Sequence, residues 1–241
     1  MARTTRLGDL AAMPVRVQQA DGVTGASKRG GEPPRRRDAG GDDLPWEALE
    51  LAAGAVSLWR GATGPVTVVA VDGHGASGKT TLAGRLCDLC GASLVHTDDF
   101  FTPVAPAASG GEVGQAIGSY YDLARLRRAA LGPLRAGREA VFRPYDWDSG
   151  RLSDGYTHVP PARIVVVEGV CSSAPALRDL VDRAIYVKTP EVERLSRLRG
   201  LIAPEDWDDE WLRAEAKYFE DIRPEDSFDL VVSGAAPAKH D

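Results

Sequence analysis

The sequence predicts an α/β protein in which a parallel β-sheet is covered by helices on both faces. Short, continuous apolar runs alternate along the 241-residue chain with segments that have helical spacing. Runs of this kind are typical of strands that are buried on both faces. A glycine-rich turn follows the first run directly and leads into one of the helical segments. The expected strands are residues 66–71, 93–97, 164–167, 184–187 and 229–232.

Helices are expected before the first strand and between the later ones. Apolar residues recur at helical spacing from Trp46 to Trp59. Asp43 is a suitable N-cap for this helix, and Pro45 suits its first turn. A later helix is expected to end before Gly91. The expected helices are residues 46–59, 79–89, 121–134 and about 205–221.

The N-terminal segment differs in composition from the rest of the chain. Residues 1–43 are rich in Gly, Ala, Arg and Asp and lack sustained apolar periodicity. Such a segment buries too little apolar surface to offset its ordering entropy, so it is predicted to be disordered. Its arginine run, residues 35–37, could contact an acidic partner, but a solvated tail is favoured. The folded domain is expected over residues 44–241, with a mobile loop at 102–118.

The overall composition excludes several classes of protein. Hydrophobic residues make up 43% of the chain, enough for a buried core, and the formal net charge is −6. The negative charge argues against nucleic acid as a partner. No apolar run approaches the ~20 residues that cross a bilayer, and the N-terminus has no secretory apolar core. A cytoplasmic protein is therefore expected, with no membrane partner and with a homo-oligomer left open.

The three cysteines predict neither a disulfide framework nor a metal site. Cys87 and Cys90 form a C-x-x-C motif, which can be redox-active or bind metal. Their spacing on an expected helix instead places two small apolar residues on one face. No second Cys or His pair completes a zinc site with them or with Cys171. Packing is therefore the favoured interpretation.

The glycine-rich turn after the first strand predicts a phosphate-binding loop. Its glycines allow a tight turn in which successive N–H groups point inward, and the helix that follows adds its positive N-terminal end. Lys79 can reach the β- and γ-phosphates of a nucleotide, and the Thr80 hydroxyl can bind Mg²⁺. The expected nucleotide-binding residues are Gly73, His74, Gly75, Ala76, Ser77, Gly78, Lys79, Thr80 and Thr81.

Acidic residues follow two of the expected strands. Asp98 and Asp99 come just after the second strand, where ligands bind in open parallel sheets. A carboxylate there can orient and deprotonate a hydroxyl that attacks a γ-phosphate, and Asp98 is favoured for this role. Glu168 ends the run 164–167 and is expected to assist Mg²⁺ beside Thr80. Helix-capping or turn roles are the alternatives for these acids.

Basic and aromatic residues complete the expected site. Arg194 and Arg197 are close to one turn apart on a helix, followed by Arg199, and guanidinium groups neutralise charge during phosphate transfer. A solvated helix face is the alternative. Tyr145 and Trp147 lie in a segment without helical period, whose mixture of polar and aromatic residues suits the wall of a small-molecule pocket. Further aromatic candidates are Tyr120 and Tyr121, whereas Trp207 and Trp211 are expected to pack.

The order and separation of these motifs resemble the uridine kinase family of P-loop kinases, within the group that includes phosphoribulokinase and bacterial pantothenate kinase. The similarity spans about residues 64–234. The matching segments are Gly-His-Gly-Ala-Ser-Gly-Lys-Thr-Thr at 73–81, His-Thr-Asp-Asp-Phe-Phe at 96–101, Tyr-Asp-Trp at 145–147, Ile-Val-Val-Val-Glu-Gly at 164–169 and Arg-Leu-Ser-Arg at 194–197.

The resemblance implies a three-layer α/β/α fold with a five-stranded parallel sheet and a helical lid. It implies ATP and Mg²⁺ as cofactors and transfer of the γ-phosphate to a hydroxyl of a small molecule. By this resemblance Asp98 is the catalytic base, Lys79 and Arg197 assist catalysis, and Arg194 contacts the nucleotide. Thr80 and Glu168 serve the metal. The expected acceptor-binding residues are Asp98, Phe100, Tyr121, Tyr145 and Trp147.

The acceptor is less closely defined than the chemistry. A nucleoside is the first expectation. However, residues 148–150 contain no histidine of the kind that contacts the pyrimidine in uridine kinases, and Asp122 is only a weak match to the acidic segment that binds ribose. A kinase of another small metabolite is one alternative. A nucleotide-binding regulator is a second, although the chain has no Asn-Lys-x-Asp segment of the kind that reads guanine in switch GTPases.

Overall fold

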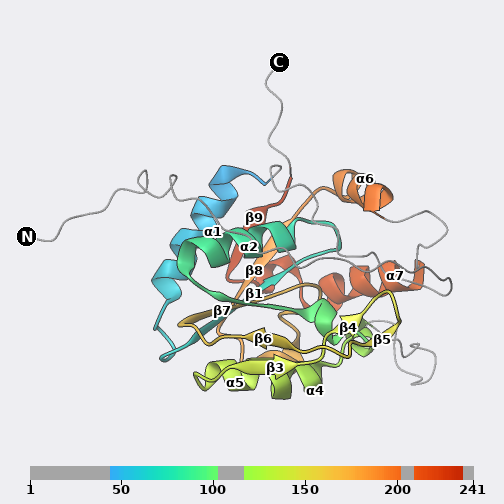
Figure 1. Cartoon of the computed structure of the whole chain (residues 1–241). Helices are drawn as coiled ribbons and strands as arrows, with labels where there is room; N and C mark the ends of the chain where they lie inside the picture. Colours follow the sequence, from blue (N-terminus) through green and yellow to red (C-terminus); the bar gives the residue numbers. More distant parts are fainter. Residues whose placement is uncertain (1–43, 103–116, 202–208, 236–241) are drawn as a thin grey trace, which may run out of the picture. The chain divides into compact units, whose positions relative to one another are not determined.

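A computed structural model describes residues 44–102, 117–201 and 209–235 of the chain. At its centre is a five-stranded parallel sheet in the order β2-β7-β1-β8-β9 (Figure 1). The strands are β1 (Thr67–Asp72), β2 (Ser93–His96), β7 (Ile164–Glu168), β8 (Arg183–Lys188) and β9 (Leu230–Ser233). Each expected strand is present within one residue at either end, which confirms the fold class. The expectations for residues 1–43, the Asp43 cap and most of the 102–118 loop concern residues outside the described ones.

The sheet is buried on both faces because its strands are continuously apolar. Along β1, Val69 and Val71 face a cluster that includes residues of the first two helices, while Val68 and Ala70 face the opposite cluster. The side chains of a strand alternate between faces, so a strand between two helical layers must be apolar at every position. Figure 1 shows α1 and α2 on one side of the sheet and α4 and α5 on the other. The structure therefore has the expected α/β/α layers.

Each expected helical range contains a helix in the described residues, although the expected helix 121–134 is divided into α4, a π-helical turn and α5, and α6 is additional to the four expected ranges. The α-helices are α1 (Trp46–Trp59), α2 (Lys79–Cys90), α4 (Leu123–Leu126), α5 (Gly132–Arg135), α6 (Glu191–Leu201) and α7 (Asp209–Lys217). Two π-helical turns, Arg127–Leu131 and Tyr218–Ile222, continue α4 and α7. The 3₁₀ segments are Thr97–Phe100, Ile117–Tyr120, Pro175–Leu177 and Glu225–Ser227. No helix within these ranges combines the length and apolarity needed to span a membrane.

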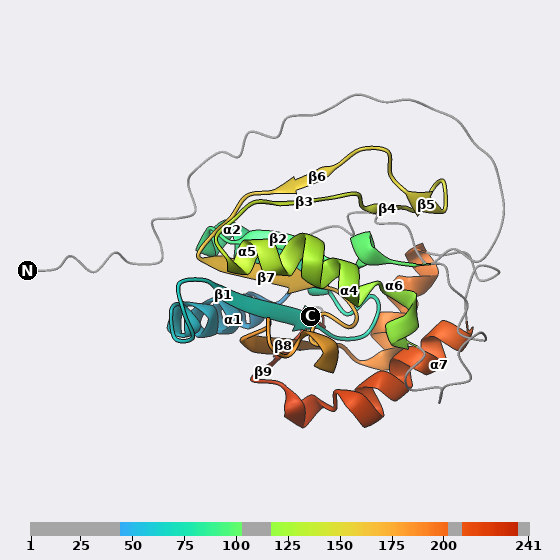
Figure 2. The same ribbon diagram turned by 90° about the horizontal axis from the view of Figure 1, so that it is seen from below.

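Two short antiparallel ladders lie outside the main sheet and were not expected from the sequence. β3 (Ala140–Phe142) pairs with β6 (Thr157–Val159), and β4 (Tyr145–Asp146) pairs with β5 (Arg151–Leu152). Strands of two or three residues are too short to show a period of two. β6 also approaches β2, the edge strand of the sheet (Figure 2). These ladders form a wall beside β2.

Candidate active site

The glycine-rich loop joins β1 to α2 at the carboxyl end of the sheet. Gly73 has φ of +140°, and a Cβ atom there would lie 2.7 Å from the backbone oxygen of Val187, so this position requires glycine. Gly78 is the left-handed residue directly before α2 begins at Lys79. The N-terminal end of α2 therefore faces the loop, as a phosphate-binding site requires.

Lys79 closes the loop across its open side. Its side chain is largely buried, and its Nζ donates a hydrogen bond of 2.7 Å to the backbone oxygen of His74. The acceptor of this hydrogen bond is a backbone oxygen and not a carboxylate, and the ammonium group lies against the loop. A phosphate bound by the loop would lie within reach of this charge, and the role of Lys79 in holding it stays a prediction.

Thr80 and Glu168 meet beside the loop, as their positions in the sequence predicted. The Thr80 hydroxyl donates a 3.2 Å hydrogen bond to Oε2 of Glu168, which is itself almost fully buried. His96 at the end of β2 is hydrogen-bonded through Nδ1 to the other carboxylate oxygen. The sequence did not single out His96 for any role. Its position on β2, next to β7, places it against Glu168 because His96 and Glu168 are register partners.

The Thr80–Glu168 pair fits a magnesium ion better than a resident transition metal. Within the described ranges no group of three or more His, Cys, Asp or Glu side chains could hold a metal by itself. A hydroxyl and one carboxylate are hard oxygen ligands, and Mg²⁺ commonly takes one or two such protein ligands together with water and substrate phosphates. The donor set therefore fits an ion that arrives with a nucleotide.

Asp98 and Asp99 lie next to each other in the 3₁₀ turn Thr97–Phe100 that follows β2. Burial raises the pKa of the Tyr121 phenol, and the charge of Asp98 raises it further, together with those of Glu215 and Asp72 beside the phosphate loop. Asp98 is therefore close enough to Tyr121 for its charge to act on the phenol. Asp99 instead lines a groove along β2. Hydrogen bonds between the segments at Phe101 and Tyr121 hold this arrangement.

Two arginines of α6 lie against the loop. Arg197 donates hydrogen bonds to the backbone oxygens of Ala76 (3.3 Å) and Gly234 (2.8 Å), and also pairs with Glu193. Arg194 is buried and lies 3.6 Å from Glu215, measured between Nη1 and Oε2. Both side chains thus share a face of α6, as predicted, whereas Arg199 is exposed.

The segment after β9 also supports the loop, which the sequence did not indicate. A Cβ atom on Gly234 would clash with the backbone oxygen of Ser77, so only glycine permits this approach. Thr189 donates a 2.8 Å hydrogen bond from its hydroxyl to the same Ser77 oxygen. Residues from the ends of β8 and β9 therefore fix the back of the loop.

Asp72 anchors the start of the loop in the core. Its carboxylate accepts hydrogen bonds from the Gly73 backbone, from the backbone and hydroxyl of Ser173 and from the Tyr218 hydroxyl. Burial raises the pKa of Asp72, although these hydrogen bonds and the charge of Lys79 lower it. The buried network joins β1, the segment after β7 and the π-helical turn after α7.

The aromatic residues correct one expectation about the acceptor site. Phe100 is 0% exposed and packs in the core against Phe142, with a ring-centroid distance of 4.7 Å. It is therefore a core residue and not an acceptor-binding one. The next residue, Phe101, takes the place that was expected for Phe100: the Phe101 ring lies 5.1 Å from Tyr145 and 4.6 Å from Trp147. Which of the two phenylalanines enters the core depends on the direction of each side chain in this part of the chain, and the sequence does not show that direction.

Three further expectations concern Asp122, the cysteine pair and the tryptophans of the late helix. The Asp122 carboxylate caps α4 by accepting a 2.8 Å hydrogen bond from the Arg125 backbone, so it is a helix cap in this structure. Burial raises the pKa of Cys87 to about 12, which disfavours a reactive thiolate. Cys87 and Cys90 pack against a core cluster, in agreement with the packing interpretation. Trp211 also packs beside the site, while Trp207 lies outside the described residues.

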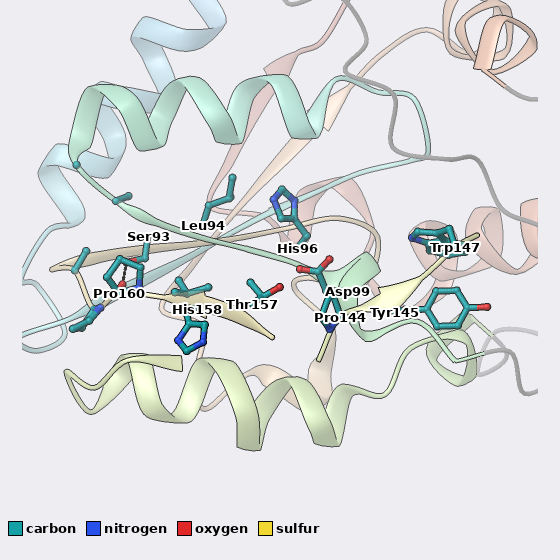
Figure 3. Close-up of a pocket in the computed structure, with 15 residues that line it drawn as sticks. Ser93, Leu94, His96, Asp99, Pro144, Tyr145, Trp147, Thr157, His158 and Pro160 are labelled. Atoms are coloured by element: carbon teal, nitrogen blue, oxygen red, sulfur yellow. Dashed lines mark hydrogen bonds between the residues drawn. The ribbon is translucent and has the colours of Figure 1, made fainter. Parts of the chain in front are cut away.

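A groove of about 740 Å³ runs along the outer edge of β2 (Figure 3). At one end Tyr145 and Trp147 stand next to Asp99, and at the other end are Ser93 and Pro160. Its lining within the described residues contains two histidines and one carboxylate but no Lys or Arg. The lining residues are 91–94, 96, 99, 144, 145, 147 and 157–162. The groove has the size of a small-molecule site and begins beside the expected acceptor residues.

Comparison with known sequences finds relatives among uridine kinases. No protein-family model matches the chain. Uridine kinases from Limosilactobacillus reuteri strain DSM 20016 and from L. reuteri subsp. reuteri strain JCM 1112 are each 27% identical to it over 137 residues. The match covers 54% of this chain and 62% of each relative. The matched region thus spans less than two thirds of the relatives' length.

Solved structures share the fold. A protein described as a possible uridine kinase from Bacillus stearothermophilus has a TM-score of 0.60 at 21% identity, over 77% of this chain and 97% of that one. The D-glycerate 3-kinase of Cryptococcus neoformans var. grubii has a TM-score of 0.55 at 17% identity, over 77% and 95%. The chain is therefore similar in sequence to uridine kinases and shares the fold of these solved structures.

Proposed function

We propose that the chain is an ATP-dependent phosphotransferase that moves the γ-phosphate of ATP to a hydroxyl of a small molecule, with a nucleoside as the first candidate. The observation that carries the proposal is the meeting of Thr80 and Glu168 beside the glycine-rich loop. Asp98 follows β2, the strand paired with β7, at the carboxyl end of the sheet where this loop also lies. The proposed base, phosphate cradle and metal-binding pair are therefore all at the carboxyl edge of the same sheet.

The proposed transfer assigns a role to each of these groups. The loop amides and Lys79 hold the phosphates, and Thr80 and Glu168 would hold Mg²⁺, which supplies charge neutralisation when bound. Asp98 accepts the proton of the acceptor hydroxyl as its oxygen forms a bond to the γ-phosphorus. The bond from that phosphorus to the bridging oxygen breaks, and ADP leaves with the bond's electrons. Arg197 lies on the loop where it can stabilise the transferring charge.

The acceptor is proposed to bind at the end of the groove lined by Asp99, Tyr145 and Trp147, next in the sequence to Asp98. Phe101, Tyr145 and Trp147 form an aromatic cluster at this end, which suits the face of a base or the apolar face of a sugar. The lining described above offers an anionic acceptor no Lys or Arg partner. An uncharged acceptor is therefore favoured over a carboxylate or a sugar phosphate. The name of the curated relatives supports a nucleoside among uncharged acceptors.

The proposal is tested by measuring ADP release from the purified full-length chain with MgATP and a panel of acceptors. The panel pairs uncharged compounds with anionic ones: uridine and cytidine with their 5′-monophosphates, and fructose and glycerol with fructose 6-phosphate and glycerate. ADP release that depends on an uncharged acceptor supports the proposal. Release that peaks with a sugar and not with a nucleoside identifies the alternative kinase. ATP hydrolysis that is independent of every acceptor contradicts it and favours a nucleotide-binding regulator.

Trp147→Ala is expected to raise the KM for the acceptor about tenfold while kcat changes less than threefold. The indole contacts both Phe101 and Tyr145, with ring-centroid distances of 4.6 and 4.7 Å, so its loss opens the aromatic wall without touching the phosphate loop. Steady-state kinetics with varied acceptor at saturating ATP measures the effect. Trp46→Ala, at an exposed position in α1, is the matched control. An unchanged KM would place the acceptor elsewhere.

A further inference from the structure

One stripe of the late helical segment covers the phosphate loop. Trp211, Glu215 and Phe219 follow each other at intervals of four along α7 and its π-helical turn, so they lie on one side of it. A Cβ atom built on Gly75 would lie 3.3 Å from the Trp211 ring, and the Phe219 ring lies 4.5 Å from that of His74. Glu215, between the two aromatic rings, binds both of these loop residues.

Glu215 is completely buried, although its side chain is a carboxylate. Its Oε1 accepts a 2.6 Å hydrogen bond from the Gly75 backbone, and its Oε2 lies 3.1 Å from Nδ1 of His74 and 3.6 Å from Nη1 of Arg194. A buried carboxylate is strongly unfavourable unless it is paired and hydrogen-bonded. Here every partner belongs either to the phosphate loop or to the arginine that the sequence placed on the nucleotide.

Arg194 shows that the cluster is incomplete without an anion. The residue is 8% exposed, and its Nη1 is buried and donates no hydrogen bond to any described residue, since 3.6 Å from Glu215 is too long for one. The hydroxyl of Ser77 in the loop is likewise buried without a partner. Guanidinium donors bind phosphate oxygens in preference to neutral groups. Unfilled donors beside a phosphate loop therefore point to a phosphate group as the missing partner.

We propose that Glu215 is a positioning residue that holds Arg194 and the His74–Gly75 part of the loop in place to receive the terminal phosphate of ATP. One side of the carboxylate fixes the loop backbone. The other keeps the guanidinium beside the loop, where Nη1 remains available to the γ-phosphate. The inference rests on the proposed function. It adds to that function a residue from α7, a helix far in the sequence from the glycine-rich loop.

The proposal competes with a second physical effect of opposite sign. A carboxylate near a nucleotide repels its phosphates, so Glu215 could instead weaken ATP binding by occupying the Gly75 amide and Arg194. Glu215→Gln separates the two effects. The glutamine oxygen can still accept from the Gly75 N–H, but the charge that attracts Arg194 is gone. Positioning predicts weaker ATP binding in this variant, whereas repulsion predicts tighter binding.

The experiment compares ATP with ADP in full-length protein, because only ATP carries the γ-phosphate. For Glu215→Gln we expect the Kd of ATP, or of a non-hydrolysable ATP analogue, to rise about tenfold and the Kd of ADP to change less than threefold. Arg194→Met should give the same pattern, and the double variant should add little to either single one. Glu220→Gln, five residues further on and exposed, is the control and should bind both nucleotides normally.

Three results would overturn the proposal. Tighter ATP binding by Glu215→Gln would make the carboxylate a competitor of phosphate. Equal losses for ATP and ADP would make it a general support of the loop. Additive losses in the double variant would separate it from Arg194. Since the measurement is of binding, it remains decisive if the wild-type chain binds ATP but transfers no phosphate, in which case the proposed function fails by itself.

Discussion

Replacing Asp98 with asparagine is expected to lower kcat by about two to four orders of magnitude while the affinity for ATP stays within about threefold. Asparagine keeps the size and the hydrogen-bonding shape of aspartate but cannot accept the proton of the acceptor hydroxyl. Asp98 follows β2 in the 3₁₀ turn Thr97–Phe100, close to Tyr121, whose phenol has its pKa raised by burial and by this carboxylate. The nucleotide itself is held by other residues, so binding and turnover should separate.

Asp99→Asn is the matched control for this prediction. Asp99 is the next residue of the same 3₁₀ turn, but it lines the groove along β2. We expect it to change the KM for the acceptor and to lower kcat less than tenfold. Single-turnover rates and nucleotide titrations on both variants give the comparison. If Asp99→Asn were the inactive variant and Asp98→Asn retained its rate, the two carboxylates would have to exchange roles.

Most of the fold follows from local sequence, because the strands of a buried parallel sheet are apolar at every position. Val66, Val68, Val69 and Val71 are all buried, and in the sequence they are separated only by Thr67 and Ala70, which are buried too. The ladders beside β2 could not be predicted in the same way. Their strands contain two or three residues, and they lie where β6 approaches β2, a contact between segments that are far apart in the sequence.

The residues of the candidate site could be predicted where a sequence motif contains them. The prediction failed where a single residue comes from a distant segment without a motif. Thr80 and Glu168 were expected to meet, and they do. Glu215 resembles Glu220 and the other charged residues of its polar helix, and nothing local marks it as buried. Only the spacing of four that relates it to Trp211 and Phe219 gave a signal, and that signal also describes an ordinary amphipathic helix.

Lys79→Ala is expected to weaken ATP binding about 10- to 100-fold and to lower kcat at least 100-fold, so that binding and turnover fall together. The Lys79 ammonium lies against the loop, held by a single hydrogen bond of 2.7 Å to the His74 backbone, and alanine removes the cation that phosphates would meet there. Wild-type protein should therefore gain several degrees in Tm with MgATP, while the variant gains little at the same concentration. Lys217→Ala removes the same charge from α7, where the side chain pairs with Asp221, and should keep the wild-type response.

The variant also tests whether the loop keeps its shape, because Lys79 donates a hydrogen bond to the loop backbone. An unchanged Tm without nucleotide, together with a lost response to MgATP, assigns the defect to the missing charge. A full response to MgATP in Lys79→Ala would mean that nucleotide does not bind at this loop, and the proposed kinase activity would lose its foundation.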